Sequence, residues 1–325
     1  ADGYTRSTGK MSMVIAQNGP GITGLVTPIK TAYWNHTPLL LVTPQAANKT
    51  MGQGGFQEVE QMNLFKDMVC YQEEVRDPSR MAEVLNRVIE KAIRGSAPAQ
   101  INVPRDYWTQ IIDIELPPIV RFERQGGGKD AIERAAKMLS DAKFPVILSG
   151  AGVVIGDAIN ECKSLAEKLD APVCNGYQHN DSFPGSHPLA VGPLGYNGSK
   201  AAMQLISKAD VVLALGTRLN PFSTLPGYGI DYWPKDANII QVDMNPDRIG
   251  LTKKITVGIA GDAKQVALQI LEKLSSNAGD NGREDRKNLI HQTKSAWLQT
   301  LTSLDHEDDD PGTVWNKEAR ERDKD

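Results

Sequence analysis

The sequence predicts an α/β protein with two doubly wound parallel-sheet domains, followed by a C-terminal linker. Three observations lead to this fold class. Short apolar runs alternate with helix-like segments, the alternation occurs in two series, and a stretch rich in proline and glycine separates the series. Strands that are connected through helices run parallel, and the helices cover the sheet. The length of 325 residues also suits about two domains.

The first series is expected to form a domain over residues 1–115. Its clearest element is a helix over 77–94, because Asp77 can cap it, Pro78 suits the first helical position and the apolar residues that follow share one face. Gly95 is expected to end this helix. The strands predicted in this domain are 11–16, 38–44, 67–75 and 98–104.

Residues 116–128 contain a Pro pair and a Gly run, and they are predicted to link the two domains. The alternation then resumes in a central domain over 129–275. Residues 276–325 are polar, with one amphipathic stretch at 284–304 and an acidic run after it, and are expected to form a linker toward a domain absent from this chain. In the central domain we predict helices at 129–142, 157–169, 199–208 and 262–274, and strands at 144–150, 171–176, 210–216 and 237–243.

Charge and composition argue against several classes of partner. The net charge of −4 gives no electrostatic reason to expect nucleic acid or an anionic membrane. Apolar runs such as 211–215 are far too short to cross a bilayer. Cys70, Cys162 and Cys174 form no C-x-x-C pair, which indicates free, buried thiols in a reducing cytoplasm.

The stretch GPGITG, Gly19 to Gly24, is a literal G-x-G-x-x-G that follows a predicted strand. A dinucleotide site also needs a regular helix after the turn and an acidic residue at the end of the second strand. Pro28 would disturb that helix, and no carboxylate follows the second strand until Glu58. The turn therefore either presents backbone N–H groups to another ligand or simply connects strand to helix. A second glycine cluster at 149–156 could cradle a diphosphate or be a packing turn.

Longer strings carry a resemblance to a known family. NGPGITGLVTPIKTAYWNHTPLLLVTPQ, followed by GQGGFQEVEQM, resembles the pyrimidine-binding domain of thiamine-diphosphate enzymes of the acetolactate synthase type. PVILSGAGV, LGTRLNPF and IIQVDMNPDRIG resemble the central domain of these enzymes, so that the resemblance covers residues 1 to about 275. Within the family, YWNHTPLLLVTPQAANKT and GYQHNDSFPGSHPLAVGPLGYNG look most like the branch that acts on sulfoacetaldehyde.

This resemblance implies a cofactor site. Gly19, Pro20 and Gly21 would lie against the aminopyrimidine of thiamine diphosphate, and Gln57 would line the same pocket. The catalytic glutamate of the family is expected upstream of Ala1, and the motif for Mg²⁺ and the diphosphate is not found, so no catalytic or metal-binding residue is assigned here. The chain alone is therefore expected to be an inactive fragment. Gly24 replaces the usual asparagine, which would either loosen a cofactor contact or ease the backbone.

The resemblance also implies an activity. The family branch converts sulfoacetaldehyde and phosphate to acetyl phosphate and sulfite, through an acetyl group carried on thiamine diphosphate, in a cytoplasmic homodimer or homotetramer. FAD or ADP is possible in the central domain but is not expected to be required. An acetolactate synthase or another carboligase is one alternative, and a non-catalytic binding module of the same fold is another.

Four residues are candidates for contact with the anionic substrates. Lys49 follows a predicted strand and either faces an anion or is a solvated loop lysine. Tyr177, Gln178 and His179 offer a hydroxyl, an amide and an imidazole directly after another strand. They would bind the sulfonate or pack as an interdomain loop.

Overall fold

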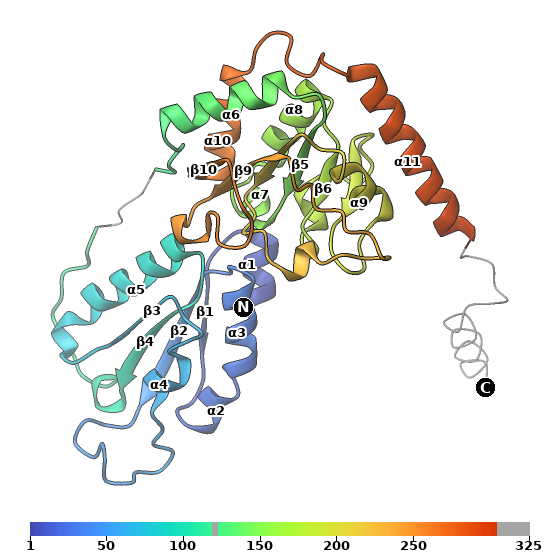
Figure 1. Cartoon of the computed structure of the whole chain (residues 1–325). Coiled ribbons are helices and arrows are strands. Elements are labelled where there is room, and N and C mark those ends of the chain that lie inside the picture. The colour runs from blue at the N-terminus through green and yellow to red at the C-terminus, as the bar shows by residue number, and fades with distance from the viewer. Residues whose placement is uncertain (119–122, 304–325) are drawn as a thin grey trace, which may run out of the picture. The chain divides into compact units, whose positions relative to one another are not determined.

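The computed structural model describes residues 1–118 and 123–303, and the chain divides into two compact units (Figure 1). Unit 1 is Ala1–Phe122 and unit 2 is Glu123–Asp325. The division falls inside the stretch of residues 116–128 that the sequence marks as a linker. Each unit holds its own parallel sheet, and each is described by itself below.

Unit 1 contains a four-stranded sheet in the order β1-β2-β4-β3, and every neighbouring pair is parallel. The strands are β1 (Ser12–Ile15), β2 (Leu39–Gln45), β3 (Tyr71–Glu74) and β4 (Ala99–Pro104). The helices are α1 (Asp2–Thr8), α2 (Pro20–Thr23), α3 (Val26–Trp34), α4 (Gln61–Phe65) and α5 (Met81–Gly95), with 3₁₀ turns at Pro78–Arg80 and Arg105–Tyr107.

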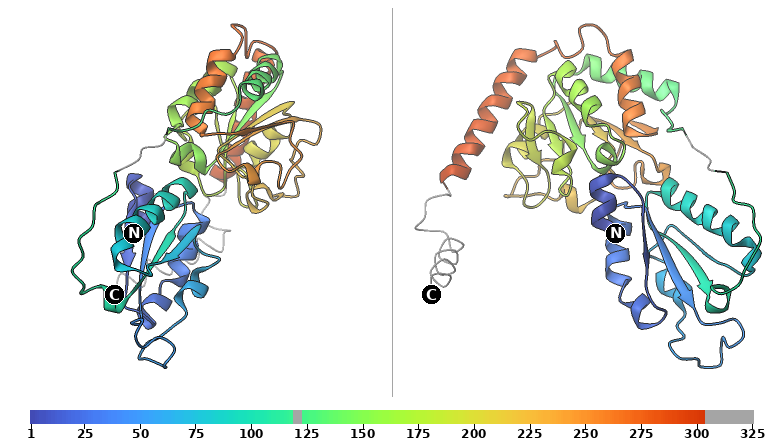
Figure 2. Two further views of the ribbon diagram at one scale, coloured as in Figure 1. Left: turned by 90° about the vertical axis from the view of Figure 1, so that its left-hand side faces the viewer. Right: turned by 180° about the vertical axis from the view of Figure 1, so that it is seen from behind.

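The apolar side chains of β2 point alternately to the two faces of the sheet, which explains why helices cover both faces. Leu40 and Val42 pack with Val88 of α5, whereas Leu39 and Leu41 belong to the cluster that includes α3. Successive side chains of a strand point to opposite faces, so one continuous apolar run supplies two cores. Figure 2 shows α5 on one side of the sheet and α3 on the other.

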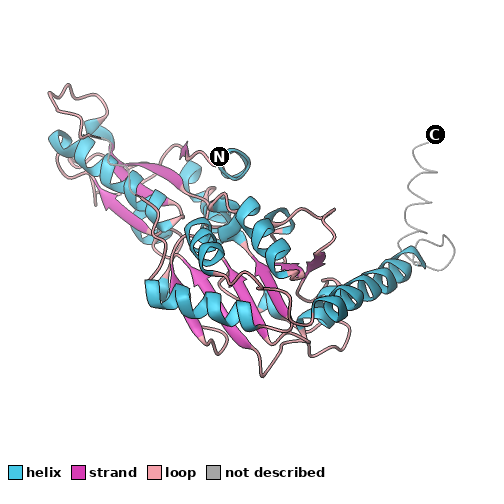
Figure 3. Cartoon of the chain, turned by 90° about the horizontal axis from the view of Figure 1, so that it is seen from above, coloured by secondary structure: helices cyan, strands magenta, loops and turns pink. Residues whose placement is uncertain are grey.

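Unit 2 contains a six-stranded parallel sheet in the order β10-β9-β8-β5-β6-β7. Figure 3 shows its strands side by side with helices over both faces. The strands are β5 (Pro145–Ser149), β6 (Val173–Asn175), β7 (Ala190–Pro193), β8 (Val211–Leu215), β9 (Asn238–Asp243) and β10 (Val257–Ala260). The helices are α6 (Lys129–Asp141), α7 (Ala151–Ile155), α8 (Ile159–Leu169), α9 (Lys200–Ile206), α10 (Ala263–Lys273) and α11 (Arg283–Ser303), with 3₁₀ turns at Asn180–Ser182, Phe222–Thr224 and Pro246–Arg248.

The second sheet separates two cores in the same way as the first. Ile147 and Leu213 face the core that is closed by α6, α8 and α10, and Val146 and Val212 face the core closed by α9. Both units are thus doubly wound α/β structures, as the alternation in the sequence predicts. No helix in the part of the chain that the structure describes is long and apolar enough to cross a membrane.

Helix α11 lies within the range predicted to be a linker, and a buried arginine fixes it to unit 2. Arg286 is 1% exposed, and its guanidinium donates to five backbone carbonyls at 2.6–3.0 Å. Two of these carbonyls, those of Leu169 and Asp170, belong to the C-terminal end of α8, where a cation is favourable. The remaining acceptors are Lys143, Gly279 and Asn281.

Some boundaries differ from the predicted ones. The strand expected at 67–75 is only β3, because Val69 is buried in the α3 core without being part of a strand. Asp77 caps the 3₁₀ turn Pro78–Arg80 by accepting from the N–H of Ser79, and α5 begins only at Met81. Gly95 is still helical, and Ser96 is the left-handed cap at φ 44°. Pro28 does not disturb a helix, since it lies in the first turn of α3, where no backbone N–H is needed.

Candidate functional site

The glycine turn Gly19–Gly24 of unit 1 follows β1 and contains α2, and its first residue has a conformation that requires glycine. Gly19 has φ 72° and ψ −117°. A Cβ atom on this residue would lie 2.8 Å from Cβ and 2.9 Å from the carbonyl oxygen of Gln57. Gly19 is therefore needed both for its backbone angle and for the close approach of a second loop.

Gln57 is bound to this turn by two hydrogen bonds. Its carbonyl oxygen accepts from Nδ2 of Asn18 at 3.1 Å, and its Oε1 accepts from Nε2 of Gln17 at 2.9 Å. Gln57 itself has φ 63°, an uncommon angle for a residue with a side chain. The structure thus brings together the predicted cofactor residues Gly19, Pro20, Gly21 and Gln57, at the carboxyl end of a parallel strand.

The loop that carries Gln57 is held in place from both sides. Oε1 of Glu58 accepts from the N–H of Gly52 at 2.6 Å, and its Oε2 accepts from that of Gly55 at 3.1 Å, so this carboxylate has a structural role. Behind the loop, Nε2 of the fully buried Gln61 donates to the carbonyl of Pro44 at 2.6 Å. These contacts fix the backbone on either side of Gln57.

Gly24 differs from Gly19. Its backbone is right-handed helical at φ −63° and ψ −17°, and an added Cβ would meet only carbonyl oxygens at 3.5 and 3.6 Å. Those are ordinary contacts, so the fold accepts a side chain here. The interpretation that glycine eases the backbone at this position is therefore wrong.

The predicted substrate residue Lys49 is exposed on the loop after β2. Its carbonyl accepts from Nε2 of Gln53 at 3.3 Å. The neighbouring Asn48 ties the loop to the segment after β4, because its Nδ2 donates to the hydroxyl of Tyr107 at 2.7 Å. No metal cluster of three or more His, Cys, Asp or Glu side chains occurs in residues 1–118 and 123–303.

In unit 2, the glycine cluster at 149–156 serves packing. A Cβ on Gly152 would lie 2.6 Å from Cα of Gly216, and one on Gly150 would lie 2.6 Å from Cβ of Thr217. The N–H of Gly152 donates to the carbonyl of Gly216 at 2.8 Å. The backbones after β5 and β8 thus touch directly, which favours the packing turn over a diphosphate cradle.

Tyr177, Gln178 and His179 follow β6 at the carboxyl edge of the second sheet. The carbonyl of His179 accepts from Oγ of Ser182 at 2.7 Å, and Ser182 is fully buried. The ring of Tyr177 meets Phe222 edge to face at 5.2 Å, whereas Gln178 is exposed. This loop belongs to unit 2 and Gln57 to unit 1, and sulfonate binding by the loop stays a prediction.

An acidic neighbour of this loop was not singled out from the sequence. Nδ1 of His179 lies 3.6 Å from Oδ1 of Asp181. A protonated imidazole would be attracted to this carboxylate, which competes with any bound anion. Asn18 and Gln17 were also missed, although an amide next to a glycine turn is a recognisable loop-bracing signal.

The cysteines match the expected buried thiols only in part. Cys162 and Cys174 are buried, and burial raises the pKa of both thiols, to about 12 for Cys162. Cys70 is exposed as a residue, so the expectation of burial is wrong there, although its Sγ donates to the carbonyl of Lys91 at 3.5 Å. Buried, protonated thiols are poor nucleophiles.

Comparison with known proteins identifies the family. Residues 1–64 match the model of the thiamine pyrophosphate enzyme N-terminal TPP binding domain, and residues 132–273 match that of the thiamine pyrophosphate enzyme central domain. The chain belongs to the thiamine pyrophosphate enzyme family. The first match contains the whole turn Gly19–Gly21 together with Gln57.

Curated relatives in the thiamine pyrophosphate enzyme family resemble the whole chain. A probable sulfoacetaldehyde acetyltransferase of Rhizobium meliloti (strain 1021) is 77% identical over 325 residues, which is 100% of this chain and 55% of the relative. The sulfoacetaldehyde acetyltransferase of Roseovarius nubinhibens is 78% identical over 320 residues, 98% of this chain and 53% of the relative. The chain thus spans about half the length of the curated relatives it matches.

A solved structure shares the fold of this chain. The benzoylformate decarboxylase of Polynucleobacter necessarius superimposes with a TM-score of 0.77 at 23% identity, over 87% of this chain and 53% of that one. At this identity the likeness bears on the fold alone.

Proposed function

We propose that this chain acts in an acetyltransferase that converts sulfoacetaldehyde and phosphate to acetyl phosphate and sulfite. The observation that carries the proposal is the close contact between Gly19 and Gln57. This contact occurs in a chain that is 77% identical along its full length to a relative named for this activity. The reaction is balanced without an external oxidant: a carbon–sulfur bond breaks, a carbon–oxygen bond to phosphate forms, and the aldehyde carbon becomes an acyl carbon as its neighbour becomes a methyl group.

Gly19, Pro20, Gly21 and Gln57 are proposed to hold the pyrimidine end of thiamine diphosphate. Their chemistry fits this group, since Gly21 has no side chain to cover the turn and the Gln57 side chain has an amide NH₂ beyond the oxygen that accepts from Gln17. Bound thiamine diphosphate supplies a carbon nucleophile and an electron sink. This chain contributes orientation: the Asn18 and Gln17 bonds fix Gln57 before any ligand arrives.

Tyr177, Gln178 and His179 are proposed to bind the sulfonate, with Lys49 as a second candidate contact for an anion. A sulfonate spreads one negative charge over three oxygens, so several neutral donors can serve it. The hydrogen bond from the buried Ser182 to the His179 carbonyl holds the loop in one conformation, which lowers the entropic cost of binding.

The remaining parts of the proposal concern the whole enzyme. The enzyme would use Mg²⁺ together with thiamine diphosphate, and it would be a cytoplasmic homodimer or homotetramer in sulfonate or taurine degradation. FAD or ADP would not be required. We place the domains at 1–115 and 129–275, with a linker at 116–128, and we assign α11 to unit 2 because Arg286 holds it there.

A turnover assay tests the function. We would join this chain to the flanking segments of the Rhizobium meliloti relative and follow sulfite release with thiamine diphosphate and Mg²⁺. Sulfite is expected from sulfoacetaldehyde only when phosphate is present, and acetyl phosphate should appear in equal amount. Acetolactate from pyruvate, without sulfite from sulfoacetaldehyde, would overturn the proposal. The same flanking segments around a Gly19→Ala variant provide the control for activity that does not depend on this chain.

A further inference from the structure

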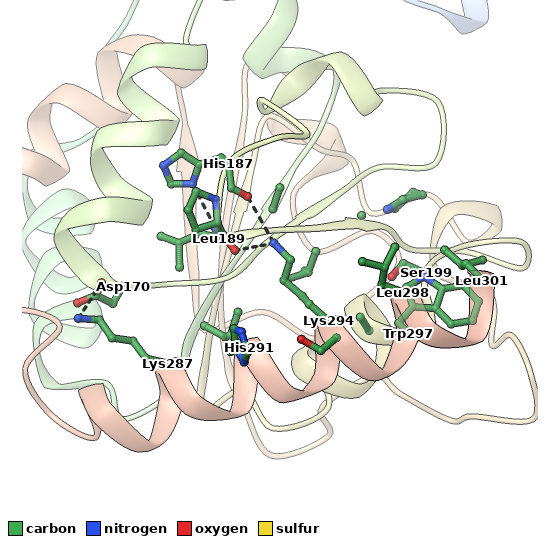
Figure 4. A pocket seen from close by; sticks show the side chains of 18 of the residues that line it. Asp170, His187, Leu189, Ser199, Lys287, His291, Lys294, Trp297, Leu298 and Leu301 are labelled. Carbon is green, nitrogen blue, oxygen red and sulfur yellow. Dashed lines mark hydrogen bonds and ion pairs between the residues drawn. The ribbon is translucent and has the colours of Figure 1, made fainter. Parts of the chain in front are cut away.

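An apolar groove in unit 2 lies outside the turns described above. It has a volume of about 840 Å³ and runs between α11 and the edge strand β7, as Figure 4 shows. Cavities of roughly 300–1,000 Å³ with mostly apolar walls and a few polar groups are typical of small-molecule sites. The wall on the strand side includes Pro188, Leu189, Ala190, Val191 and Pro193.

One face of α11 forms the opposite wall. Lys294, Trp297, Leu298 and Leu301 all line the groove, and their spacing of three, four and seven residues places them on the same side of a helix. Leu298 is 64% exposed, so this wall is open to solvent. The apolar residues extend from Lys294 toward the C-terminal end of α11, over roughly 10 Å of helix.

Lys287 and His187 have acidic neighbours along the groove, and His291 also lines it. Lys287 lies 3.9 Å from Asp170, and His187 lies 3.2 Å from Glu167. In the described part of the chain, the ammonium of Lys294 bonds only to neutral groups: it donates to the carbonyls of Pro188 at 2.6 Å and His187 at 3.5 Å. An ammonium group has three donors, so one N–H is left for a ligand.

The surroundings of Lys294 favour an anion. Figure 4 shows its side chain crossing the groove from α11 toward the segment of His187 and Leu189. Burial lowers the pKa of this lysine, as expected for a half-enclosed ammonium whose hydrogen-bond partners are neutral carbonyls. A bound anion would supply the missing countercharge.

We propose that this groove binds a small organic monoanion, with its acidic head on Lys294 and its apolar body along Trp297, Leu298 and Leu301. The ligand class is an alkyl or aryl carboxylate or a chemically equivalent monoanion. The inference stands apart from the proposed acetyltransferase activity, because none of the groove residues belongs to the turn or loop assigned there.

Octanoate is the probe, and octan-1-ol is its neutral match of similar length. We would titrate each into the 325-residue chain by calorimetry and follow the fluorescence of Trp297, with Trp297→Phe to assign the signal. Octanoate is expected to bind at micromolar to millimolar concentration, tighter than octanol, and to change the Trp297 signal. Lys294→Met should weaken octanoate binding roughly ten- to a hundredfold and leave octanol binding unchanged.

Lys200→Met is the matched control. Lys200 lies beside the groove without lining it, with its Nζ 5.8 Å from the ring centroid of Trp297. This variant is expected to keep octanoate affinity within twofold. The proposal is overturned if octanoate and octanol bind equally, if Lys200→Met weakens octanoate while Lys294→Met does not, or if neither probe binds at millimolar concentration. Unchanged octanol binding by Lys294→Met excludes misfolding as the cause of a loss.

Discussion

Gly19 and Gln57 meet so closely that no side chain fits between them. A Cβ on Gly19 would lie 2.8 Å from Cβ of Gln57, and both residues have positive φ angles, 72° and 63°. The contact joins segments that are 38 positions apart. Two uncommon backbone conformations are thus combined in one place, which is frequent at ligand sites.

Replacing Gly19 by alanine is expected to destabilise unit 1. The variant combines left-handed strain with a steric clash, and we expect the free energy of unfolding to fall by about 1–3 kcal/mol or more. Urea unfolding followed by circular dichroism measures this. Gly24→Ala is the matched control, since its backbone is helical and its Cβ has room. That change should be neutral or stabilising by up to about 1 kcal/mol, and equal losses in the two variants would contradict the geometry.

Gln57→Gly tests the backbone conformation at position 57 separately from the amide side chain. Glycine adopts φ 63° without strain and keeps the carbonyl that accepts from Asn18, but it loses the bond from Gln17, so folding stability should change little. The amide is lost, and the affinity for thiamine diphosphate in the enzyme with flanking segments should fall by roughly tenfold. Gln57→Ala keeps the strain and loses the amide. If affinity is unaltered in both variants, the Gln57 side chain does not contact the cofactor.

The sequence predicts the central strands of both sheets well because these are buried on both faces and appear as unbroken apolar runs, such as that of β2. It does not predict β7 or β10. Both are short edge strands, and the exposed residues of β10 alternate with buried ones over only four positions.

The candidate site is predictable to a similar degree. The glycines of the turn mark a special backbone, and Gly19 does require one. The positive φ of Gln57 and its bonds to Gln17 and Asn18 depend on how a distant loop returns to the turn. No local pattern encodes that return, so the residues that hold the site together became visible only in three dimensions.

Thiol reactivity should follow burial. In the native protein at pH 8, a disulfide reagent such as DTNB is expected to modify Cys70 alone, and all three cysteines after unfolding in guanidinium. The raised pKa of about 12 leaves the Cys162 thiol protonated at this pH, and complete burial also raises the pKa of the Cys174 thiol. The pKa of Cys70 is also raised, so its reaction should be slower than that of free cysteine and should accelerate as pH increases. Rapid release of more than one equivalent of thionitrobenzoate per native chain would contradict this prediction.

His179→Ala tests the sulfonate loop. In the enzyme with flanking segments, KM for sulfoacetaldehyde is expected to rise roughly ten- to a hundredfold, because a hydrogen bond to a charged group is lost, while KM for phosphate changes less. Asp181→Asn removes the competing carboxylate 3.6 Å from Nδ1 and should lower the same KM. Lys49→Ala tests the second candidate anion contact, which lies in unit 1, in the same assay. Unchanged sulfoacetaldehyde kinetics in His179→Ala and Asp181→Asn would remove this loop from the site.

Arg286 should contribute far more to the stability of unit 2 than its neighbour Arg283. Arg286→Met leaves five carbonyl oxygens without their donor in a buried place, and each unsatisfied buried group costs about 1–3 kcal/mol. Partial relaxation makes the sum smaller, so we expect a loss of about 3 kcal/mol or more in urea unfolding. Arg286→Lys keeps the charge but lacks the planar fork, and its loss of unfolding free energy should be intermediate.

Arg283 provides the control. It is half-exposed and pairs with Asp170 at 2.6 Å and Asp280 at 3.1 Å, so Arg283→Met should cost about 1 kcal/mol or less. Equal losses for Arg286→Met and Arg283→Met would show that the carbonyl contacts do not anchor α11, and proteolysis within α11 should then be as fast in the parent protein as in Arg286→Met.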